Sequence, residues 1–356
     1  MPLNSNYLQP SRTGAEDADS PSRYLASLPL PGIRWPCMNE TSSQEHTHSK
    51  PITVILNADS GNTDKQEAHQ LLADTFAAHG IKVQMMLAKS GAELVELAQR
   101  AVASDCQIIV AGGGDGTINA VATALVGTDK TLGVLPLGTL NHFAKDLGIP
   151  LNLAAAVHTI IAGRTGQVDV GEVNGLIFLN NSSLGLYPTI VRQRERRQQR
   201  GYGKWTAFVW ASLKVLRRYP FLNVRLSVEG KEIFTRTPFV FIGNNEYETN
   251  SLNIGSRSCL NNGQLSLYVT HDTGRVGLLR IALRALLGRL RNTQDFVAMC
   301  TTEVWVKTRH RRERVSTDGE VTVLETPLHY RVRPGALRVL LPANEQETQE
   351  KAEVKP

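Results

Sequence analysis

The segment QIIVAGGGDGT, residues 107–117, joins a short apolar run directly to a glycine-rich turn. The continuous hydrophobic stretch Gln107–Ala111 is typical of a strand buried in a parallel sheet. Glycines let the chain turn sharply after it, and Thr117 opens a helical stretch that continues through Ile118–Val126. Amide groups in such a turn, together with the positive end of the following helix, form an anion-binding site. The segment therefore predicts an α/β unit with an anion site at the end of its strand.

Asp115 is unexpected in a loop that only binds anions, because its carboxylate would repel a phosphate. The charge is understandable if a divalent cation or a substrate proton lies between the two groups. Taken alone, the segment is also compatible with an ordinary strand-to-helix turn that begins with an acidic residue. The neighbouring motifs favour the first interpretation.

Composition indicates a folded protein with more than one domain. The chain has 356 residues, 41% of them hydrophobic, and no run approaches the ~20 apolar residues of a membrane span. Residues 1–50 are rich in Ser, Pro, Asn and Thr and predict a disordered leader, and residues 343–356 predict a polar tail. The four cysteines form no CxxC pair, which argues against structural zinc and suits a reducing cytoplasm.

Strand-like and helix-like segments alternate between residues 51 and 170. The predicted strands are Ile52–Ala58, Ile81–Leu87, Gln107–Ala111 and Leu132–Leu137, and the predicted helices are Asp64–His79, Ala92–Ala103, Ile118–Val126 and Ala154–Ile161. This alternation predicts a doubly wound α/β domain, a parallel sheet with helices on both faces. Ligands of such sheets bind beyond the carboxyl ends of the strands.

The pattern changes in residues 171–342, where short β-rich runs separated by turn residues dominate. The expected strands are Leu176–Asn181, Asn223–Val228, Phe239–Gly243, Gln264–Thr270, Glu303–Lys307, His329–Val332 and Leu337–Leu341, the last two separated by a turn at Pro334-Gly335. Helical patterns interrupt them at Lys204–Arg218 and Val276–Arg291. We expect an antiparallel second domain with helical insertions.

Small hydrogen-bonding residues follow three of the predicted strands of the first domain. Asn57, Ser60 and Gly61 follow the first strand, the glycine loop follows the third, and Thr139 and Asn141 follow the fourth. These side chains can approach a nucleotide closely, and three such loops at one sheet edge are stronger evidence than any one of them. The chain has neither GxxxxGK[ST] nor GxGxxG, which excludes two common nucleotide motifs.

The motifs together resemble the diacylglycerol kinase catalytic-domain family, which contains bacterial lipid kinases and is related to sphingosine and ceramide kinases. The resemblance lies in Asn57-x-x-Ser60-Gly61, Gly113-Gly-Asp-Gly-Thr117, Leu132-Gly-Val-Leu-Pro-Leu-Gly-Thr139-x-Asn141 with Phe143-Ala144, and Asp318-Gly-Glu320. It covers roughly residues 51–342. It implies an N-terminal doubly wound α/β domain, like that of NAD kinase and diacylglycerol kinase, followed by an antiparallel β-sandwich domain. It also implies that ATP binds between the two and that its γ-phosphate passes to a lipid hydroxyl.

The resemblance also assigns roles to residues. Glu320 would be the general base, with Asp318 nearby and Asp115 acting through Mg2+. The expected nucleotide-binding residues are Asn57, Ser60, Gly61, Gly113, Gly114, Asp115, Gly116, Thr117, Ile118, Asn119, Ala120, Thr139 and Asn141. Without the resemblance, Ser316–Glu320 is better interpreted as a simple hairpin turn.

Three positions depart from the family pattern, and two alternative functions stay open, one from the GGDGT loop that NAD kinases share and one from these departures. Ala58, where the family often has proline, is a mild change. His142 stands where the family usually has Asp, and Asn262-Gly263 stands where some members have the Asp-Gly of a structural metal site. One alternative is an NAD kinase-type phosphotransferase, whose Asn-Glu motif would be sought in Asn245-Glu246. The other is a non-catalytic homologue that binds a nucleotide or a lipid.

Two basic amphipathic segments, Arg192–Arg218 and Arg280–Arg291, predict contact with an anionic membrane. Residues 190–220 hold nine Lys and Arg side chains against one Glu, an excess larger than the chain's whole net charge of +6. The alternative is that the apolar faces pack on the domain core and the arginines are solvated. No nucleic-acid motif accompanies the charge. We expect a cytoplasmic protein associated peripherally with the inner membrane; the acceptor lipid and a homodimeric state stay open.

Overall fold

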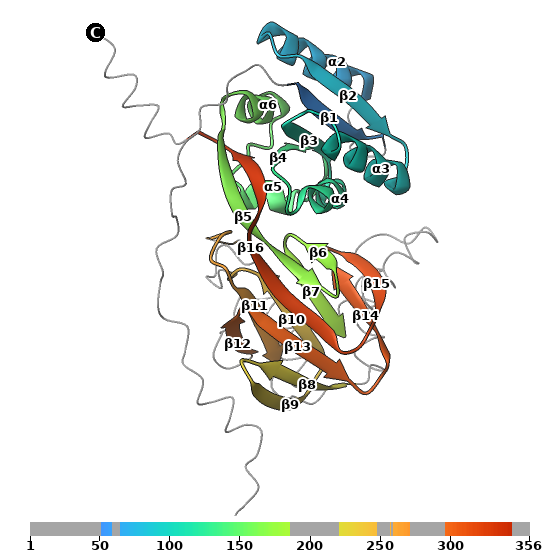
Figure 1. Cartoon of the computed structure of the whole chain (residues 1–356), viewed down its shortest axis with the longest axis vertical. Helices are drawn as coiled ribbons and strands as arrows, with labels where there is room; N and C mark the ends of the chain where they lie inside the picture. Colours follow the sequence, from blue (N-terminus) through green and yellow to red (C-terminus); the bar gives the residue numbers. More distant parts are fainter. Residues whose placement is uncertain are drawn as a thin grey trace, which may run out of the picture.

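The computed structural model describes residues 51–58, 65–185, 221–247, 257, 259–270 and 296–343. Figure 1 shows an α/β half above a β half, with two long strands, β5 and β16, running between them. No helix in these residues is both long enough and apolar enough to span a bilayer. The leader, both basic amphipathic segments and the tail beyond residue 343 lie outside the described residues.

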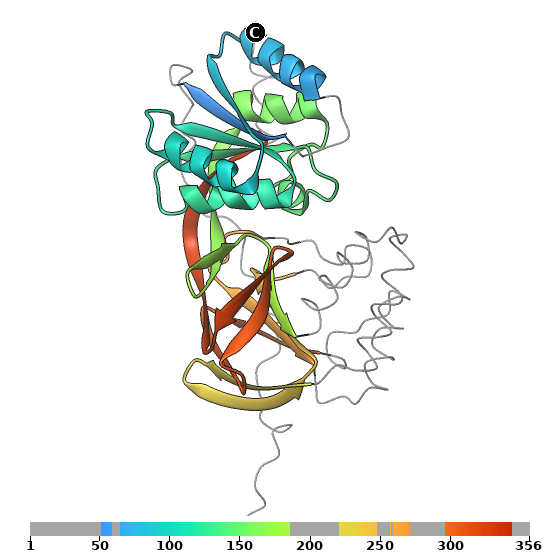
Figure 2. The ribbon, with the colours of Figure 1, turned by 90° about the vertical axis from the view of Figure 1, so that its right-hand side faces the viewer.

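Parallel strands form the centre of the α/β half, in the order β2-β1-β3-β4. These strands are β1 (Ile52–Asn57), β2 (Val83–Ala88), β3 (Ile108–Gly113) and β4 (Thr131–Pro136). The helices are α2 (Lys65–Ala78), α3 (Gly91–Val102), α4 (Asp115–Leu125), α5 (His142–Asp146) and α6 (Leu153–Ala162). Helix α3 packs beside α4, and α2 beside α6. Helices cover both faces of the sheet (Figure 2), so the predicted doubly wound domain is confirmed.

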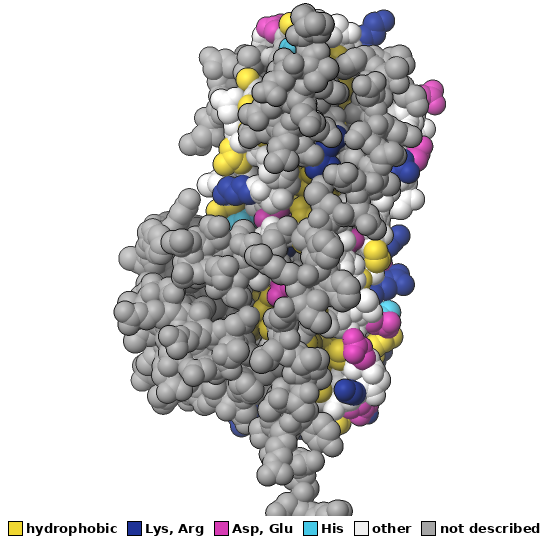
Figure 3. All heavy atoms as spheres, turned by 90° about the vertical axis from the view of Figure 1, so that its left-hand side faces the viewer, with side chains coloured by type: hydrophobic (Ala, Val, Ile, Leu, Met, Phe, Trp, Pro, Cys, Tyr) yellow, Lys and Arg dark blue, Asp and Glu magenta, His cyan; other side chains and the backbone are white. Residues whose placement is uncertain are grey.

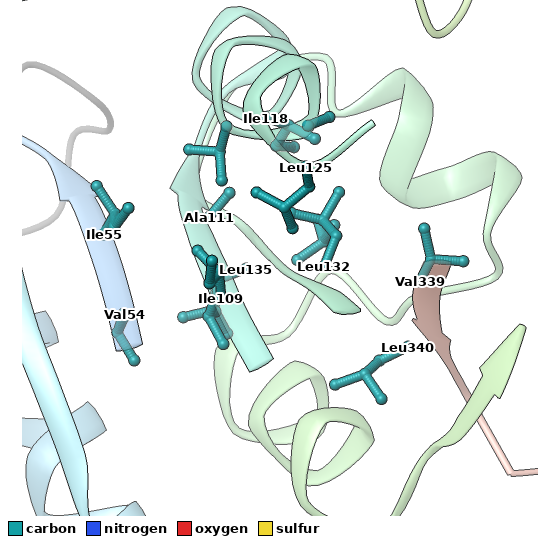
Figure 4. Packing of buried hydrophobic residues seen from close by; sticks show 14 of the residues in the cluster. Val54, Ile55, Ile109, Ala111, Ile118, Leu125, Leu132, Leu135, Val339 and Leu340 are labelled. Carbon is teal, nitrogen blue, oxygen red and sulfur yellow. The ribbon is translucent and has the colours of Figure 1, made fainter. Parts of the chain in front are cut away.

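Local sequence explains these elements. Strands β3 and β4 are almost wholly buried, as their uninterrupted apolar runs predict. Helix α3 begins where Ser90 accepts a hydrogen bond from the Glu93 amide, and α6 begins where Asn152 accepts one from the Ala155 amide. Side chains from the strands and from α4 meet in one core (Figure 4), which includes Ile109, Leu125 and Leu132.

The β half is a sandwich. One layer is an antiparallel sheet in the order β12-β11-β10-β7-β14-β15, and the other is the continuation of the first sheet through β16-β13-β8-β9, with β5 and β6 alongside. The first layer comprises β7 (Asn181–Gly185), β10 (Phe239–Asn244), β11 (Leu265–Thr270), β12 (Phe296–Thr301), β14 (Arg312–Thr317) and β15 (Glu320–Glu325). The second comprises β5 (Arg164–Val173), β6 (Leu176–Phe178), β8 (Leu222–Val228), β9 (Lys231–Thr237), β13 (Glu303–Thr308) and β16 (Leu328–Leu341).

Strand β16 belongs to both halves. Its first residues pair antiparallel with β13, and Arg338 and Val339 pair parallel with β4. The turn predicted at Pro334-Gly335 is wrong, because the strand continues through it with a register shift between Arg333 and Leu337. Val339 and Leu340 reach the core of the α/β half (Figure 4).

The strand predictions for the β half are partly wrong in detail. The single strand predicted at Leu176–Asn181 is two strands, β6 and β7. Three strands, β5, β9 and β12, were not predicted, and β14 and β15 were implied only by the hairpin turn expected at Ser316–Glu320. The expected architecture, an α/β domain with a parallel sheet followed by an antiparallel sandwich, is nevertheless confirmed.

Candidate functional site

The carboxyl ends of β1, β3 and β4 lie at one edge of the parallel sheet, as predicted. Asn57 ends β1, and its Nδ2 donates a hydrogen bond to Thr117 Oγ1 in α4 (3.1 Å). Ser60 and Gly61 lie outside the described residues. The end of β1 and the first turn of α4 are therefore linked directly by side chains.

Glycines allow the second and third loops to approach each other. A Cβ built on Gly138 would lie 2.4 Å from Gly114 Cα, and one on Gly113 would lie 2.5 Å from Thr117 Cβ. No side chain fits at either distance. At Gly138 the second and third loops therefore meet backbone to backbone, and at Gly113 the glycine leaves room for Thr117 of the following helix. The Leu137 amide also donates to the Gly113 carbonyl (3.1 Å).

Helix α4 begins in the glycine loop and directs its first amides toward this edge. The Ile118 amide donates to the Gly114 carbonyl (3.0 Å), and the amides of residues 115–117 precede that first intrahelical bond. The Ile118 side chain is fully buried in the core, and Ala120 packs against the same core. The backbone of the first turn, rather than these two side chains, is what α4 can offer to an anion.

Asn141 shapes the third loop. It has a left-handed φ of 50°, and its side chain folds back over the loop. Its Oδ1 accepts from the Gly138 amide (3.0 Å), and its Nδ2 donates to the carbonyls of Gly138 (2.8 Å) and Pro136 (3.3 Å). Asn141 is buried by these bonds, whereas Thr139 and His142 are exposed. Thr139 and His142 are thus the polar side chains of this region that are accessible to a ligand.

Asp115 connects the second loop to helix α5. Its Oδ1 accepts a hydrogen bond from the Phe143 amide (3.2 Å), and the side chain is only partly buried. In the described residues, no group of three His, Cys, Asp or Glu side chains could form a metal cage. Mg2+ needs no such cage, since it usually binds one or two carboxylates together with substrate phosphates. The single, partly buried carboxylate of Asp115, beside the amides of the first turn of α4, fits that arrangement.

Asp318 lies in a tight hairpin turn between β14 and β15, as the local sequence alone favours. Asp318 and Gly319 have φ values of 47° and 91°, and Thr317 pairs with Glu320. The Asp318 carboxylate accepts hydrogen bonds from the amides of residues 179, 180 and 181 (2.7, 2.9 and 3.0 Å). Asn119 Nδ2 in α4 donates a fourth (2.6 Å). Burial raises the pKa of Asp318, and these four donors oppose that rise.

Glu320 begins β15, and its side chain is exposed. A Cβ built on Gly116 would lie 3.4 Å from Glu320 Oε1. The carboxylate of Glu320 therefore lies directly beside the first turn of α4, at Gly116. The sandwich half thus presents Glu320, and the α/β half presents its free amides, to the same region.

Asn245 does not offer a dinucleotide-binding surface. The residue is fully buried, and its Oδ1 accepts from the Asn262 amide (3.0 Å). The neighbouring Gly263 amide donates to Asp169 (2.6 Å), a buried carboxylate that also accepts from the Gly335 amide (2.8 Å). Asn245 and Asp169 thus serve to hold the turn at residues 262–263 and the bulge of β16.

An ion pair that the sequence analysis did not identify also joins the two halves. Arg257 Nη2 lies 2.7 Å from Asp146 Oδ2, and both side chains are buried. The residues are 111 positions apart, so no local spacing could have signalled the contact.

Acidic and basic side chains are interspersed on the described part of the surface that Figure 3 shows.

Comparisons with known proteins agree with this geometry. Residues 51–173 match the family described as diacylglycerol kinase catalytic domain. Residues 188–341 match the family described as YegS C-terminal NAD kinase beta sandwich-like domain. The two matches follow one another along the chain and correspond to the α/β half and most of the sandwich.

Individual relatives cover most of the chain. It is 27% identical to a protein named diacylglycerol kinase from Bacillus subtilis, over 76% of this chain and 90% of that one. It is 29% identical to a protein named probable lipid kinase YegS-like from Klebsiella pneumoniae, over 81% and 95%. The crystal structure of a diacylglycerol kinase from Bacillus anthracis, 21% identical, superposes with a TM-score of 0.63 over 83% of this chain and 98% of that one, which supports the fold.

Proposed function

The chain belongs to the diacylglycerol kinase catalytic-domain family, and from that premise we propose that it transfers the γ-phosphate of ATP to a lipid hydroxyl group. The observation that carries the proposal is the position of Glu320, whose Oε1 would lie 3.4 Å from a Cβ on Gly116. A carboxylate that can accept a proton therefore stands beside amides that can hold phosphates. Phosphoryl transfer needs this combination of positioning and charge.

The α/β half would hold the nucleotide. The amides of residues 115–117 would donate to phosphate oxygens at the positive end of α4. Thr139, exposed on the third loop, would contact the nucleotide, while Asn57 and Asn141 keep their loops in place. Asp115 would hold Mg2+ with the phosphates. When bound, Mg2+ supplies positive charge that balances the phosphate oxygens.

Glu320 would accept the proton of the lipid hydroxyl. As that proton leaves, the hydroxyl oxygen bonds to the γ-phosphorus and the bond between the γ-phosphorus and ADP breaks. A carboxylate suits this role if it lies within hydrogen-bonding reach of the hydroxyl. Asp318 would act indirectly. Its carboxylate already accepts four hydrogen bonds, so we infer that it positions the hairpin that carries Glu320.

A lipid acceptor requires the enzyme to work at a bilayer. We propose peripheral binding at the cytoplasmic side of the inner membrane through the basic segments Arg192–Arg218 and Arg280–Arg291. Each Lys or Arg near an anionic surface contributes about 1 kcal/mol to binding. Several together would hold the protein at the surface without a membrane-spanning helix.

The decisive assay uses the purified full chain with Mg-ATP and vesicles that contain diacylglycerol, monoacylglycerol, a sphingoid base or ceramide. The product is identified by its mass, and NAD is tested as acceptor in parallel. We expect a phosphorylated lipid and no NADP. Phosphorylation of NAD with no lipid product would favour the NAD kinase-type alternative, which the burial of Asn245 disfavours. Binding of ATP without any product would favour a non-catalytic homologue.

A further inference from the structure

Arg257 is a buried cation whose hydrogen-bonding capacity is completely used. Nε and Nη2 both donate to Asp146 Oδ2 (3.0 and 2.7 Å). Nη1 donates to the carbonyls of Leu179 (2.7 Å) and Asn244 (3.0 Å), and Nη2 donates to Asn180 Oδ1 (2.8 Å). These bonds account for all five N–H groups of a guanidinium. Such saturation fixes the orientation of the side chain as well as its position.

The two ends of this network lead to the two sides of the candidate site. Asp146 is the last residue of α5, and α5 meets both phosphate-side loops, through Asn141 at its start and through the bond from the Phe143 amide to Asp115. At the other end, Leu179 and Asn180 give oxygens to Arg257 and amides to Asp318. One short segment therefore holds Arg257 on one side and the Glu320 hairpin on the other.

From this arrangement we propose that the Asp146–Arg257 pair is a positioning element, which sets the place of Glu320 relative to the phosphate-binding loops. The inference rests on the proposed function, because it concerns the same site. The bond from Asn119 to Asp318 is one attachment between α4 and the hairpin, and the Asp146–Arg257 pair attaches α5 to the segment behind that hairpin. The pairing of β14 with β7 holds the hairpin within its own sheet, and these two attachments on different helices fix it relative to the α/β half.

The consequence for catalysis follows from geometry. In-line transfer requires the attacking oxygen and its base to be placed closely, and a displacement of about 1 Å can lower the rate about 100-fold. Loss of the pair should therefore lower kcat more than it weakens ATP binding, because the amides of residues 115–117 belong to α4 and keep their own support. If the pair only stabilised the fold, its loss would not lower kcat while leaving the affinity for ATP unchanged.

The test compares the full-length wild type with the double variant Asp146→Leu/Arg257→Met, which removes both charges and leaves neither one unpaired. We expect kcat for lipid phosphorylation to fall at least tenfold, with the dissociation constant for ATP within threefold of wild type. The matched control is Glu172→Gln/Arg331→Met, which removes a 2.8 Å ion pair that lies within the β5–β16 ladder. The control should keep kcat within twofold. A kcat near wild type in the double variant, or an equal fall in the control, would overturn the proposal.

A second variant serves if the double variant does not fold. Arg257→Lys keeps a cation for Asp146 but cannot reach the oxygens of Leu179 and Asn180 at the same time. We expect a folded protein with reduced kcat; wild-type kcat in this variant would also overturn the proposal.

Hydrogen exchange separates this inference from the proposed function. The amides of residues 179–181 should exchange faster in the variants, while those of β1 and β3 stay protected. Unchanged exchange at residues 179–181 contradicts the positioning role even if the wild type phosphorylates no lipid. Absence of lipid phosphorylation by the wild type, in contrast, contradicts the proposed function alone.

Discussion

Asn119 in α4 donates a 2.6 Å hydrogen bond to Asp318, which lies 199 positions later in the chain at the tip of the β14–β15 hairpin. The bond spans the two halves of the molecule. It places the turn that carries Glu320 against the helix whose first amides face the candidate nucleotide site. The α/β half and the sandwich are thus fixed to each other at the place where the proposed chemistry needs both.

Replacement of Glu320 by Gln should abolish most lipid phosphorylation while ATP still binds. The amide keeps the size of the side chain but cannot accept the hydroxyl proton, and loss of a general base lowers the rate about 100-fold to 10,000-fold. The measurements are kcat with vesicles and ATP binding by calorimetry. Glu325→Gln on the same strand is the control, since that exposed carboxylate pairs with Arg312 and Arg311 at the surface, away from α4. Equal activity of wild type and Glu320→Gln would remove Glu320 from the mechanism.

Replacement of Gly138 by Ala should weaken ATP binding. The new Cβ would lie 2.4 Å from Gly114 Cα, so the second and third loops must separate. We expect the dissociation constant for ATP to rise at least tenfold, which corresponds to about 1.4 kcal/mol. Gly91→Ala is the control, because its Cβ meets nothing within 4 Å. If both variants bind ATP alike, the close approach of the loops has no part in the site.

Replacement of Asp318 by Ala should destabilise the protein as well as inactivate it. The change leaves three backbone amides and the Asn119 amide without their acceptor. A buried donor left unsatisfied costs about 1–3 kcal/mol, so we expect the free energy of unfolding to fall by about 3 kcal/mol or more. Urea unfolding measures this, with exposed Asp105→Ala as control. In a double-mutant cycle with Asn119→Ala, additive losses would show that the 2.6 Å bond contributes nothing.

Replacement of Asp115 by Asn should raise the Mg2+ requirement of the reaction. The amide oxygen can still accept from the Phe143 amide, so the loop keeps its shape, but the negative charge is lost. We expect the Mg2+ concentration for half-maximal rate to rise at least about tenfold, because hard cations favour carboxylate oxygen. Chelation by EDTA should stop the wild-type reaction. Asp129→Asn, exposed in the loop before β4, should respond to Mg2+ like wild type.

The sandwich should lose stability at alkaline pH, in part through Cys300 in β12. Burial raises the pKa of this thiol from 9 to about 11, with a smaller contribution from Glu246. The folded state therefore favours the neutral thiol. Its contribution to stability is complete below pH 9 and is lost as the pH rises through about 11. Melting temperatures at pH 8 and pH 10.5 should differ less in Cys300→Ala than in wild type; equal differences would mean that the thiol ionises as freely as in the unfolded chain.

The sequence predicted the α/β half well because each strand there is a continuous apolar run with helices on both sides. Strand β5 could not be found in this way. Its sequence RTGQVDVGEV mixes Gly, Asp and Glu with valines, and its strand conformation depends on the long pairing with β16. The same holds for β14 and β15, whose exposed faces carry charged side chains. Tertiary pairing, rather than local hydrophobicity, determines these strands.

The candidate site shows a similar division. The glycine loop and the segment Thr139–Asn141 could be recognised locally, because small residues follow more than one buried strand at the same sheet edge, whereas any one such loop is also compatible with an ordinary turn. The proximity of Glu320 to Gly116 depends on a contact across the two halves, and only the family resemblance suggested it. No sequence motif pointed to Arg257. Its hydrogen-bond partners are distant in the sequence, and its role depends on the several oxygens that the fold brings around its guanidinium group.

The place of β16 determines the order in which this chain can be completed during synthesis. Val339 and Leu340 lie about 200 positions after β4, yet they cover the apolar flank of that strand. That flank stays uncovered on the ribosome until β16 has been synthesised. A fragment that stops at residue 173 would lack this cover, so the α/β half is not a detachable unit, and a stop codon placed before residue 339 would damage a part of the fold that was made much earlier.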